Sequence, residues 1–521
     1  MLFLGNLSAQ DHHHRHESLD VLSYRFELDL NDSTDVLSGI AEIKMSFLKE
    51  TEHFYLDLIY DPTDQSGMKV HKVCENGKEI VFLQEKHQIS LQIDQAHKGE
   101  QRTYRIAYSG IPTDGLIISK NKFGDRTFFG DNWPNRARHW LATIDHPSDK
   151  ALVEFVVHAP DHYGVVSVGT LKEEVRKKGR LTSHWFTSYP LSTKMMVVGV
   201  SPFAVQYLES SSGIPVSSWV YPQNQEEGFL DYSMATLPLE FFESYLGPYP
   251  FRKLANVQSK TVYGGMENAS CIFYHERSVS GKQRIENLLA HEIAHQWFGD
   301  AVSEQDWHHI WLSEGFATYL TDLYIEHTHG REAFVASMED EKGQVLRFAK
   351  RRLAPIVDTT LSVSTRLLNK NSYEKGGWVL HMLRHDMGDE KFRRCLQTFF
   401  EEYKHDNALT QDFLQVVESI TGSEYDAFFR QWFHTAGHPV LSLEWKQKRR
   451  GLKLTIRQHQ EQHVFHFPLE IEILGTKGES LRKKVKIDSR EQSLILDLPF
   501  NAKEVISDPD TWLLYELYQG S

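Results

Sequence analysis

The hydrophobic periodicity of the chain changes twice along its length, and these two changes constrain the fold more than any other feature. From about residue 22 to 205 apolar and polar residues alternate, as in YRFELDL, GIAEIKMSF and ALVEFVVHA. Between about 214 and 438 the spacing becomes helical, as in GFLDYSMATLPLEFFESYLG. Alternation returns afterwards in LKLTIRQ, VFHFPLEIEIL and SLILDLPF. A period of two predicts strands and a spacing of three to four predicts helices, so we expect a multidomain α+β protein.

These regimes predict the domain organisation. Residues 1–17 are expected to be a leader or disordered tail, 18–208 an antiparallel β domain, 209–437 a helix-rich domain, and 438–521 a small β-sandwich of the immunoglobulin-like kind. The start, MLFLGNLSAQ, resembles the end of a bacterial signal peptide but lacks a basic n-region. It indicates export only weakly, and a cytoplasmic location stays open. The HHHRH cluster that follows is read as a solvated leader.

Composition excludes several function classes. A formal net charge of −14 disfavours nucleic acid as a partner. No run of about 18 apolar residues occurs, so no membrane span is expected. The three cysteines, Cys74, Cys271 and Cys395, are odd in number and scattered. They predict buried small hydrophobic residues instead of a disulfide framework or a cysteine zinc site.

The stretch HEIAHQWFGD, residues 291–300, is the first candidate for chemistry. The chain holds 28 histidines, so an H-E-x-x-H string arises by chance in roughly one such chain in ten. The apolar spacing of RIENLLAHEIAHQWFG, however, predicts a largely buried helix that stops at Gly299. On it, His291 and His295 lie one turn apart on one face and can reach a single ion, with Glu292 one step round. Buried histidines need partners, which favours a metal.

A third ligand is found in WLSEGFATYL, where Glu314 follows His295 after eighteen residues. Alone, this residue would be an ordinary exposed glutamate. Together with the histidine pair it completes a set of two imidazoles and one carboxylate, which suits zinc and leaves one position open.

These residues carry a family resemblance. HEIAH, eighteen residues and WLSEGFA resemble the gluzincin aminopeptidases, the family of aminopeptidase N and leukotriene A-four hydrolase. YGGMENAS, residues 263–270, matches that family's G-x-M-E-N signature, although by itself it would read as a turn and a strand. NSYEKGGWVLHML matches the segment that supplies the family's catalytic tyrosine, here Tyr373. The resemblance covers essentially the whole chain and implies a thermolysin-like α/β lobe within 209–437.

The resemblance implies a role for each matched residue. One zinc ion would be held by His291, His295 and Glu314, with Glu292 as general base and Tyr373 stabilising the developing oxyanion. Glu267 would pair with the free α-ammonium of the substrate. The segment expected to align an extended substrate comprises Gly264, Gly265, Met266, Glu267 and Asn268. The expected activity is zinc-dependent removal of N-terminal residues from peptides that carry a free amine, by attack of a zinc-activated water on the first peptide bond.

One segment departs from the family pattern. Relatives carry a second amine-binding Glu or Gln before an Ala-Arg pair. In FFGDNWPNRARHWLATIDHPSDKA, alignment on Pro134 and Ala137-Arg138 places Asp131 and Trp133 at the corresponding positions. Asp131 is therefore a candidate amine contact, and Trp133 could instead shape the first side-chain pocket. The alternative, in which Asp131 only caps a turn, stays open.

Three rival functions remain open. A lipid epoxide hydrolase needs a long apolar channel, which in relatives is walled partly by a helical domain that the resemblance does not extend to. The same consideration predicts an open cleft that accepts longer peptides, unless a second subunit of a homo-oligomer covers it. A non-catalytic peptide-binding scaffold is disfavoured by the intact Glu292 and Tyr373, and an endopeptidase by Glu267.

Overall fold

The computed structural model describes residues 16–449 and 451–519. The expected leader, 1–17, therefore lies almost entirely outside the described residues. The chain forms two compact units. The first runs to Ser313 and includes Ser362–Thr365 and Leu396–Phe413; the second comprises Glu314–Leu361, Arg366–Cys395 and the chain from Leu414 onward.

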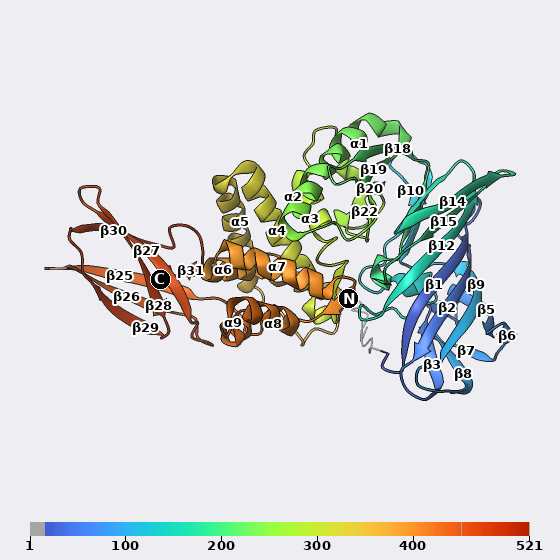
Figure 1. Ribbon diagram of the computed structural model, residues 1–521, viewed down its shortest axis with the longest axis horizontal. Coiled ribbons are helices and arrows are strands. Elements are labelled where there is room, and N and C mark those ends of the chain that lie inside the picture. The colour runs from blue at the N-terminus through green and yellow to red at the C-terminus, as the bar shows by residue number, and fades with distance from the viewer. Residues whose placement is uncertain (1–15, 450, 520–521) are drawn as a thin grey trace, which may run out of the picture. The chain divides into compact units, whose positions relative to one another are not determined.

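A ten-stranded sheet dominates the N-terminal part of the first unit (Figure 1). Its main path is β14 (Thr170–Lys177), β15 (Arg180–Phe186), β12 (Lys150–Pro160), β1 (Leu19–Asp29), β2 (Leu37–Phe47), β9 (Gln101–Ile111), β5 (Ser66–Glu75) and β4 (Tyr60–Asp61), with β16 (Leu191–Ser192) beside β12 and β6 (Lys78–Glu79) beside β5. Strand β2 buries every second residue, as its alternation predicts.

The expectation of a wholly antiparallel sheet is wrong at one pair of strands. β1 and β12 run parallel, with Ser23 opposite Leu152 and Asp29 opposite His158. Each strand has only one exposed residue, and a parallel pair needs a long connection between its strands. Here more than a hundred residues separate the two strands, and the alternation within each strand carries no information on their relative direction.

Three smaller sheets also belong to the first unit. They are formed by β10 (Leu116–Lys120), β11 (Arg126–Gly130), β17 (Val198–Ser201) and β13 (Gly164–Ser167); by β3 (Thr51–Asp57), β8 (Gln88–Ala96) and β7 (Phe82–Gln84); and by β23 (Val302–Glu304) with β24 (Asp406–Ala408).

A mixed five-stranded sheet follows and positions part of the candidate site. Its order is β18 (Ala204–Glu209), β19 (Pro215–Val220), β20 (Leu254–Ser259), β22 (Cys271–His275) and β21 (Gly265–Met266). Helices α1 (Gln225–Tyr232), α2 (Thr236–Leu246) and α3 (Glu286–Ala294) lie beside it (Figure 1). β20 is buried throughout, as a central strand with parallel neighbours should be. β21, which carries part of GGMEN, lies at the sheet edge.

The remaining helices follow in sequence. They are α4 (Trp311–His329), α5 (Arg331–Ala349), α6 (Gly376–Met387), α7 (Asp389–Tyr403), α8 (Thr410–Thr421) and α9 (Asp426–Phe433). The division between the two units passes through α4, α7 and α8. The prediction of a helix-rich middle region is confirmed.

Two sheets form the C-terminal part of the second unit. One has the order β29 (Glu491–Leu496), β26 (Gly451–Gln458), β25 (Val440–Lys448) and β31 (Glu516–Leu517); the other has β28 (Ser480–Ile487), β27 (Phe467–Gly475) and β30 (Ala502–Ser507). Residues of β27 alternate between buried and half-buried along its whole length. The return to β structure predicted from the sequence is therefore confirmed.

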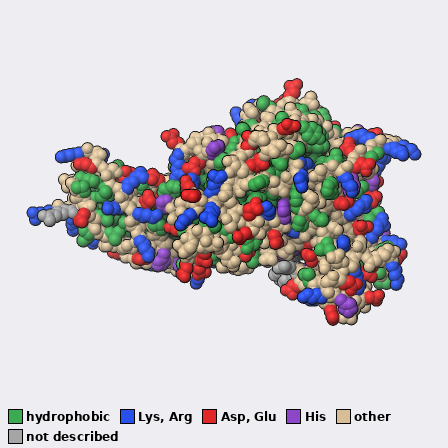
Figure 2. All heavy atoms as spheres, viewed as in Figure 1, with side chains coloured by type: hydrophobic (Ala, Val, Ile, Leu, Met, Phe, Trp, Pro, Cys, Tyr) green, Lys and Arg blue, Asp and Glu red, His purple; other side chains and the backbone are tan. Residues whose placement is uncertain are grey.

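Two further expectations concern the surface and the thiols. Among the residues that the structure describes, no helix has both the length and the apolar composition needed to cross a bilayer. On the face shown in Figure 2, acidic and basic side chains are interspersed. The three cysteines are free: Cys271 and Cys395 are buried as predicted, whereas Cys74 is half-buried.

Candidate metal and substrate site

The two histidines of HEIAH lie at the end of α3, with His291 in its last turn and His295 as its C-cap. Their Nε2 atoms are 3.1 Å apart. Two imidazole nitrogens that share one tetrahedral ion at the usual bond length lie about 3.3 Å from each other. The separation in this structure therefore fits a shared ion, as the one-turn spacing predicts.

The helix stops earlier than the sequence suggests. α3 ends at Ala294, and the chain continues in tighter turns, in which Trp297 N–H donates to Ala294 O at 3.1 Å. Gly299, the predicted stop, has φ +131° and lies beyond these turns. A Cβ atom there would come within 2.9 Å of His295 Nδ1 and 2.5 Å of Ser313 Oγ, so glycine is needed for close packing around the histidine.

The outer nitrogen of His295 has protein partners. Nδ1 lies 3.2 Å from Phe298 O and 3.0 Å from Ser313 Oγ. A proton on Nδ1 would be donated to the carbonyl oxygen, and Nε2 would then carry the lone pair that faces His291. Such partners fix the tautomer and orientation of metal-binding histidines. Sequence reasoning missed Ser313, although it directly precedes Glu314.

Glu314 lies in the first turn of α4 and is 5% exposed. Residues 311–313 of the same turn belong to the first unit, and Glu314 follows them directly in α4. The ligand atoms of His291, His295 and Glu314 all lie within 4.8 Å of one another. The structure thus gathers the three predicted ligands, and two imidazoles with one carboxylate are a donor set that zinc accepts.

A second cluster joins the first through His295. Side-chain atoms of Glu267, Glu292 and His295 lie within 4.8 Å of one another. Both glutamates are buried, and among the described residues Glu267 Oε1 has no hydrogen-bond partner. A buried carboxylate oxygen without a donor is costly, so this atom is suited to a cationic group that arrives from outside the protein.

The glycines before Glu267 differ in their surroundings. A Cβ atom on Gly265 would lie 2.2 Å from Glu292 Oε1, whereas one on Gly264 would have its nearest neighbour, Leu288 Cδ1, at 3.9 Å. Only Gly265 is therefore required by the close approach of the Glu292 carboxylate.

The other two members of this segment are buried. Met266, in the edge strand β21, pairs with Phe273 of β22. Asn268 is fully buried, and its side-chain amide has no hydrogen-bond partner among the described residues. The free side of an edge strand offers backbone groups to an extended peptide.

Gln296 was missed by the sequence reasoning although it directly follows HEIAH. Its side chain is fully buried and donates to the backbone oxygen of Glu267. A glutamine within a stretch that the sequence predicts to be a largely buried helix was the available signal, because buried amides require partners.

Asp131 lies in the first unit and is fully buried. Its Oδ2 accepts hydrogen bonds from Thr261 Oγ1 and Val262 N, each at 3.1 Å, and Oδ1 pairs with the Arg136 guanidinium. Burial raises the pKa of the carboxyl group, and Arg136 opposes that shift. Both oxygens are thus engaged by protein donors, two of which belong to the loop that leads into GGMEN.

Trp133 is 1% exposed and belongs to a cluster of rings. Its ring contacts Tyr263 edge-on at 6.1 Å and Trp307 at 5.5 Å, measured between ring centroids. Lys194 Nζ lies 5.6 Å from the Trp307 ring and forms a buried ion pair with Glu304 at 2.6 Å. Burial lowers the pKa of Lys194, but Glu304 and Glu267 outweigh it and raise the pKa overall.

Tyr373 is half-buried in a single π-helical turn, Asn371–Lys375, in the second unit. Such turns are frequent at functional sites. The turn is fixed by hydrogen bonds from Asn371 Nδ2 to Ala354 O at 2.9 Å and from Ser372 Oγ to Leu367 O at 2.6 Å.

Close packing joins this turn to α4 within the second unit. A Cβ atom on Gly315 would lie 3.0 Å from Gly376 Cα and 3.1 Å from Ser372 O. The backbone next to Glu314 therefore packs directly against the backbone next to Tyr373.

Comparison with known protein families agrees with this arrangement. Residues 231–432 match the peptidase family M1 domain, and residues 21–195 match the peptidase M1 N-terminal domain. The chain belongs to peptidase family M1.

Several curated proteins are similar along much of the chain. A leucyl aminopeptidase of Saccharolobus solfataricus is 25% identical over 88% of this chain and 59% of its own length. Aminopeptidase M1-B of Oryza sativa subsp. japonica is 28% identical over 81% and 50%, respectively. A glutamyl aminopeptidase of Rattus norvegicus is 28% identical over 61% and 35%. The chain thus spans between about a third and three fifths of the length of these relatives.

Proposed function

We propose that this chain is a zinc-dependent aminopeptidase that removes N-terminal residues from peptides. The observation that carries the proposal is the buried Glu267 oxygen that has no donor among the described residues, within the cluster that also holds Glu292 and His295. An amine anchor so close to a general base and a metal ligand restricts hydrolysis to the first peptide bond. The names of the relatives, all aminopeptidases, support the same reading.

His291, His295 and Glu314 would hold the zinc ion. The 3.1 Å separation of the imidazole nitrogens and the partners of His295 Nδ1 support this assignment. When bound, zinc supplies a Lewis acid that polarises a carbonyl group and makes a water molecule more acidic at neutral pH.

The other steps, which are substrate binding, proton transfer and stabilisation of negative charge, are assigned to residues of the chain. Glu267 pairs with the substrate's α-ammonium, and the edge strand at Gly265 and Met266 aligns the peptide backbone. Glu292 accepts the proton of the attacking water and returns it to the leaving amine. The hydroxyl of Tyr373 donates a hydrogen bond to the oxygen that becomes negative, and loss of one such donor typically costs ~10²–10³ in rate.

Asp131 and Trp133 complete the proposal. Because both oxygens of Asp131 are already bonded to the protein, we assign it to holding the loop at Thr261 and Val262, so that it acts on substrate binding through that loop. Trp133, with Tyr263 and Trp307, is assigned to the wall of the first side-chain pocket.

The domain division 18–208, 209–437 and 438–521 is part of the same proposal. We infer a thermolysin-like catalytic domain from the match of residues 231–432 to the peptidase family M1 domain and an immunoglobulin-like sandwich from the two C-terminal sheets.

The deciding experiment compares one peptide that has a free N-terminus with its N-acetylated twin, in the presence of zinc. The proposal requires cleavage of the free peptide alone, at its first bond, and loss of that cleavage in Glu267→Ala. Equal cleavage of both peptides would make the protein an endopeptidase. If neither peptide is cleaved, the peptidase proposal is overturned. A lipid epoxide hydrolase or a non-catalytic peptide-binding scaffold would then be the better explanation.

A further inference from the structure

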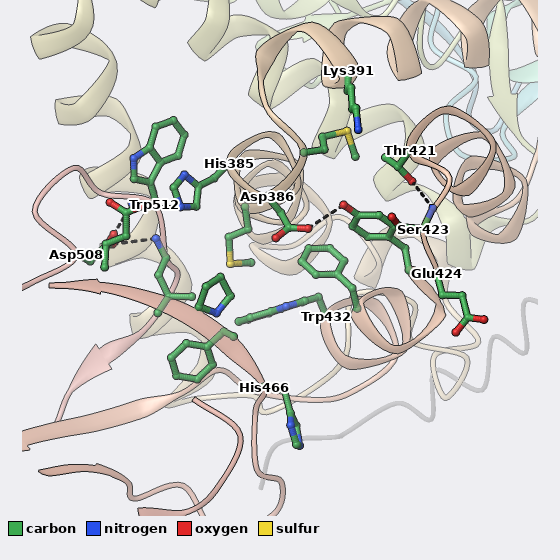
Figure 3. Close-up of a pocket in the computed structure, with 18 residues that line it drawn as sticks. His385, Asp386, Lys391, Thr421, Ser423, Glu424, Trp432, His466, Asp508 and Trp512 are labelled. Carbon is green, nitrogen blue, oxygen red and sulfur yellow. Dashed lines mark hydrogen bonds and ion pairs between the residues drawn. The ribbon is translucent and has the colours of Figure 1, made fainter. Parts of the chain in front are cut away.

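A cavity of about 440 Å³ lies within the second unit, and none of its lining residues belongs to the candidate metal and substrate site. It is bounded by the last turns of α6, by α9 and the turn before it, by the start of β27, and by the segment 508–513 (Figure 3). Its volume is within the range of small-molecule sites.

Half of the residues that line the cavity are apolar or aromatic. The apolar lining residues include Met382, Phe428, Trp432, Phe467 and Leu513, and most of them are buried. The rings of Phe428 and Trp432 lie 6.4 Å apart at a tilted angle. Such a wall accepts an apolar body or the flat face of a cation.

The charged groups in the lining are mainly acidic. The lining contains one lysine, Lys391, and four carboxylates, those of Asp386, Glu424, Glu470 and Asp508. Two of the carboxylates are already engaged. Asp508 accepts from the backbone N–H groups of Trp512 and Leu513, each at 2.8 Å, and Glu470 lies 3.3 Å from His385 Nε2.

The other two carboxylates keep unused acceptor atoms. Asp386 Oδ2 accepts a hydrogen bond from the Tyr425 hydroxyl at 2.8 Å, which fixes the carboxylate at the cavity (Figure 3). Among the described residues no hydrogen bond reaches its Oδ1, and none reaches the Glu424 carboxylate. Both side chains are exposed; the Asp386 carboxylate lies beside the aromatic wall, whereas the Glu424 side chain points away from it (Figure 3).

We propose that this cavity binds a small organic cation, a guanidinium or primary ammonium group on an apolar stem. The cation would bind at Asp386, and the stem would lie against Phe428 and Trp432. Charge-assisted hydrogen bonds and cation–π contacts act together in such a site. The excess of carboxylates repels anions, and a neutral ligand would offer the Asp386 carboxylate no positive charge to pair with.

The test uses N-acetyl-argininamide in isothermal titration calorimetry with the full chain. This probe has no free α-amine, so it cannot use an amine anchor at Glu267, and the result does not depend on the proposed function. Its matched neutral twin is N-acetyl-citrullinamide. We expect a dissociation constant on the order of 1 mM or lower for the cation, at least tenfold weaker binding of the twin, and weakening of the cation's binding as salt is added.

Two variants locate the binding. Asp386→Asn preserves the shape and can still accept from Tyr425, and it should weaken binding of the cation at least tenfold while leaving the neutral twin unchanged. Asp340→Asn removes an exposed carboxylate of α5 that is not part of the lining, and it should change nothing. Phe428→Leu should weaken both cation and twin.

Benzylammonium is tested on the Glu267→Ala protein, in which the proposed amine anchor cannot bind it. Comparison of its affinity with that of N-acetyl-argininamide distinguishes free amines from basic side chains as the natural source of the cation. Equal affinity for cation and neutral twin, an unchanged affinity in Asp386→Asn, or no binding of either cation at 10 mM would each overturn the proposal.

Discussion

Gln296 Nε2 donates a hydrogen bond of 2.6 Å to the backbone oxygen of Glu267, which ties the segment after α3 to the proposed amine anchor. The same side chain donates to Asp300 Oδ2 at 2.8 Å. Its Oε1 accepts from Ser270 N at 2.7 Å and from the Tyr249 hydroxyl at 3.0 Å. One buried amide therefore makes four bonds, and two of them hold the backbone on either side of Asn268.

Replacing this amide should impair both stability and substrate binding. Gln296→Ala leaves buried partners unsatisfied, which costs about 1–3 kcal/mol in the free energy of unfolding. We expect kcat/KM for a free-amine peptide to fall about tenfold, mainly through KM, with bound zinc unchanged. Gln223→Ala, which removes an exposed bond to Asp125, is the control and should change neither quantity. An unaltered KM in Gln296→Ala would exclude the positioning role.

Gly265 and Gly264 form a matched pair for testing the close approach of Glu292. Gly265→Ala places a methyl group 2.2 Å from Glu292 Oε1, so the carboxylate must move. Because displacement of a reacting group by about 1 Å can cost 10²-fold in rate, we expect kcat to fall by about that factor. Gly264→Ala has room and should retain most activity. Similar kcat values for the two variants would show that Glu292 tolerates displacement.

Metal removal should abolish turnover, and Ser313 should influence metal affinity. The Ser313 hydroxyl lies 3.0 Å from His295 Nδ1. Loss of a partner of this kind typically weakens metal binding 10–100-fold, so Ser313→Ala should lose zinc at lower chelator concentrations than the wild type. Ser201→Ala removes a buried hydroxyl that bonds only the carbonyl of Pro202, and it should match the wild type. Chelator competition monitored by metal analysis measures both, and turnover that survives complete metal removal would refute the zinc assignment.

Asp131→Asn tests the loop-holding role. The amide nitrogen that replaces one carboxylate oxygen cannot accept from Arg136 or from the loop donors at Thr261 and Val262. KM should therefore rise for all free-amine peptides while zinc binding stays constant. Thr261→Val removes only the side-chain bond to Asp131 and should reproduce a smaller part of the effect. If Asp131→Asn changes KM and Thr261→Val does not, a direct contact with the substrate amine becomes the better explanation.

The pH dependence of stability should reveal a buried carboxyl group on α4. Burial raises the pKa of Asp322 to about 7, and burial together with Asp322 raises the pKa of its neighbour Glu341. Between about pH 4 and 7 the folded state therefore binds more protons at Asp322 than the unfolded state, so this contribution to stability is lost as the pH rises.

Asp322→Asn removes that loss. Relative to the wild type, the variant's midpoint of thermal unfolding should rise steadily from pH 4.5 to 7.5. Asp340→Asn, at an exposed carboxylate, should show a constant difference over the same range. A flat difference for Asp322→Asn would mean that Asp322 is ionised throughout.

The sequence predicted those features that depend on short-range geometry. A four-residue spacing on a helix places His291 and His295 on one face regardless of the rest of the chain, because helical periodicity is local. Alternation predicted the burial pattern of strands such as β2 and β27 for the same reason. The family signatures added Glu314 and Glu267 to the predicted site residues.

Tertiary packing decided everything that joins distant segments. The parallel pairing of β1 with β12, the four bonds of Gln296 and the engagement of Asp131 by the loop at Thr261 have no local periodicity that encodes them. The same is true of the acidic cavity beside Trp432, whose wall is drawn from four separate stretches of the chain. Sequence patterns report which face of an element is apolar, whereas the partners of a buried polar group depend on how those faces pack together.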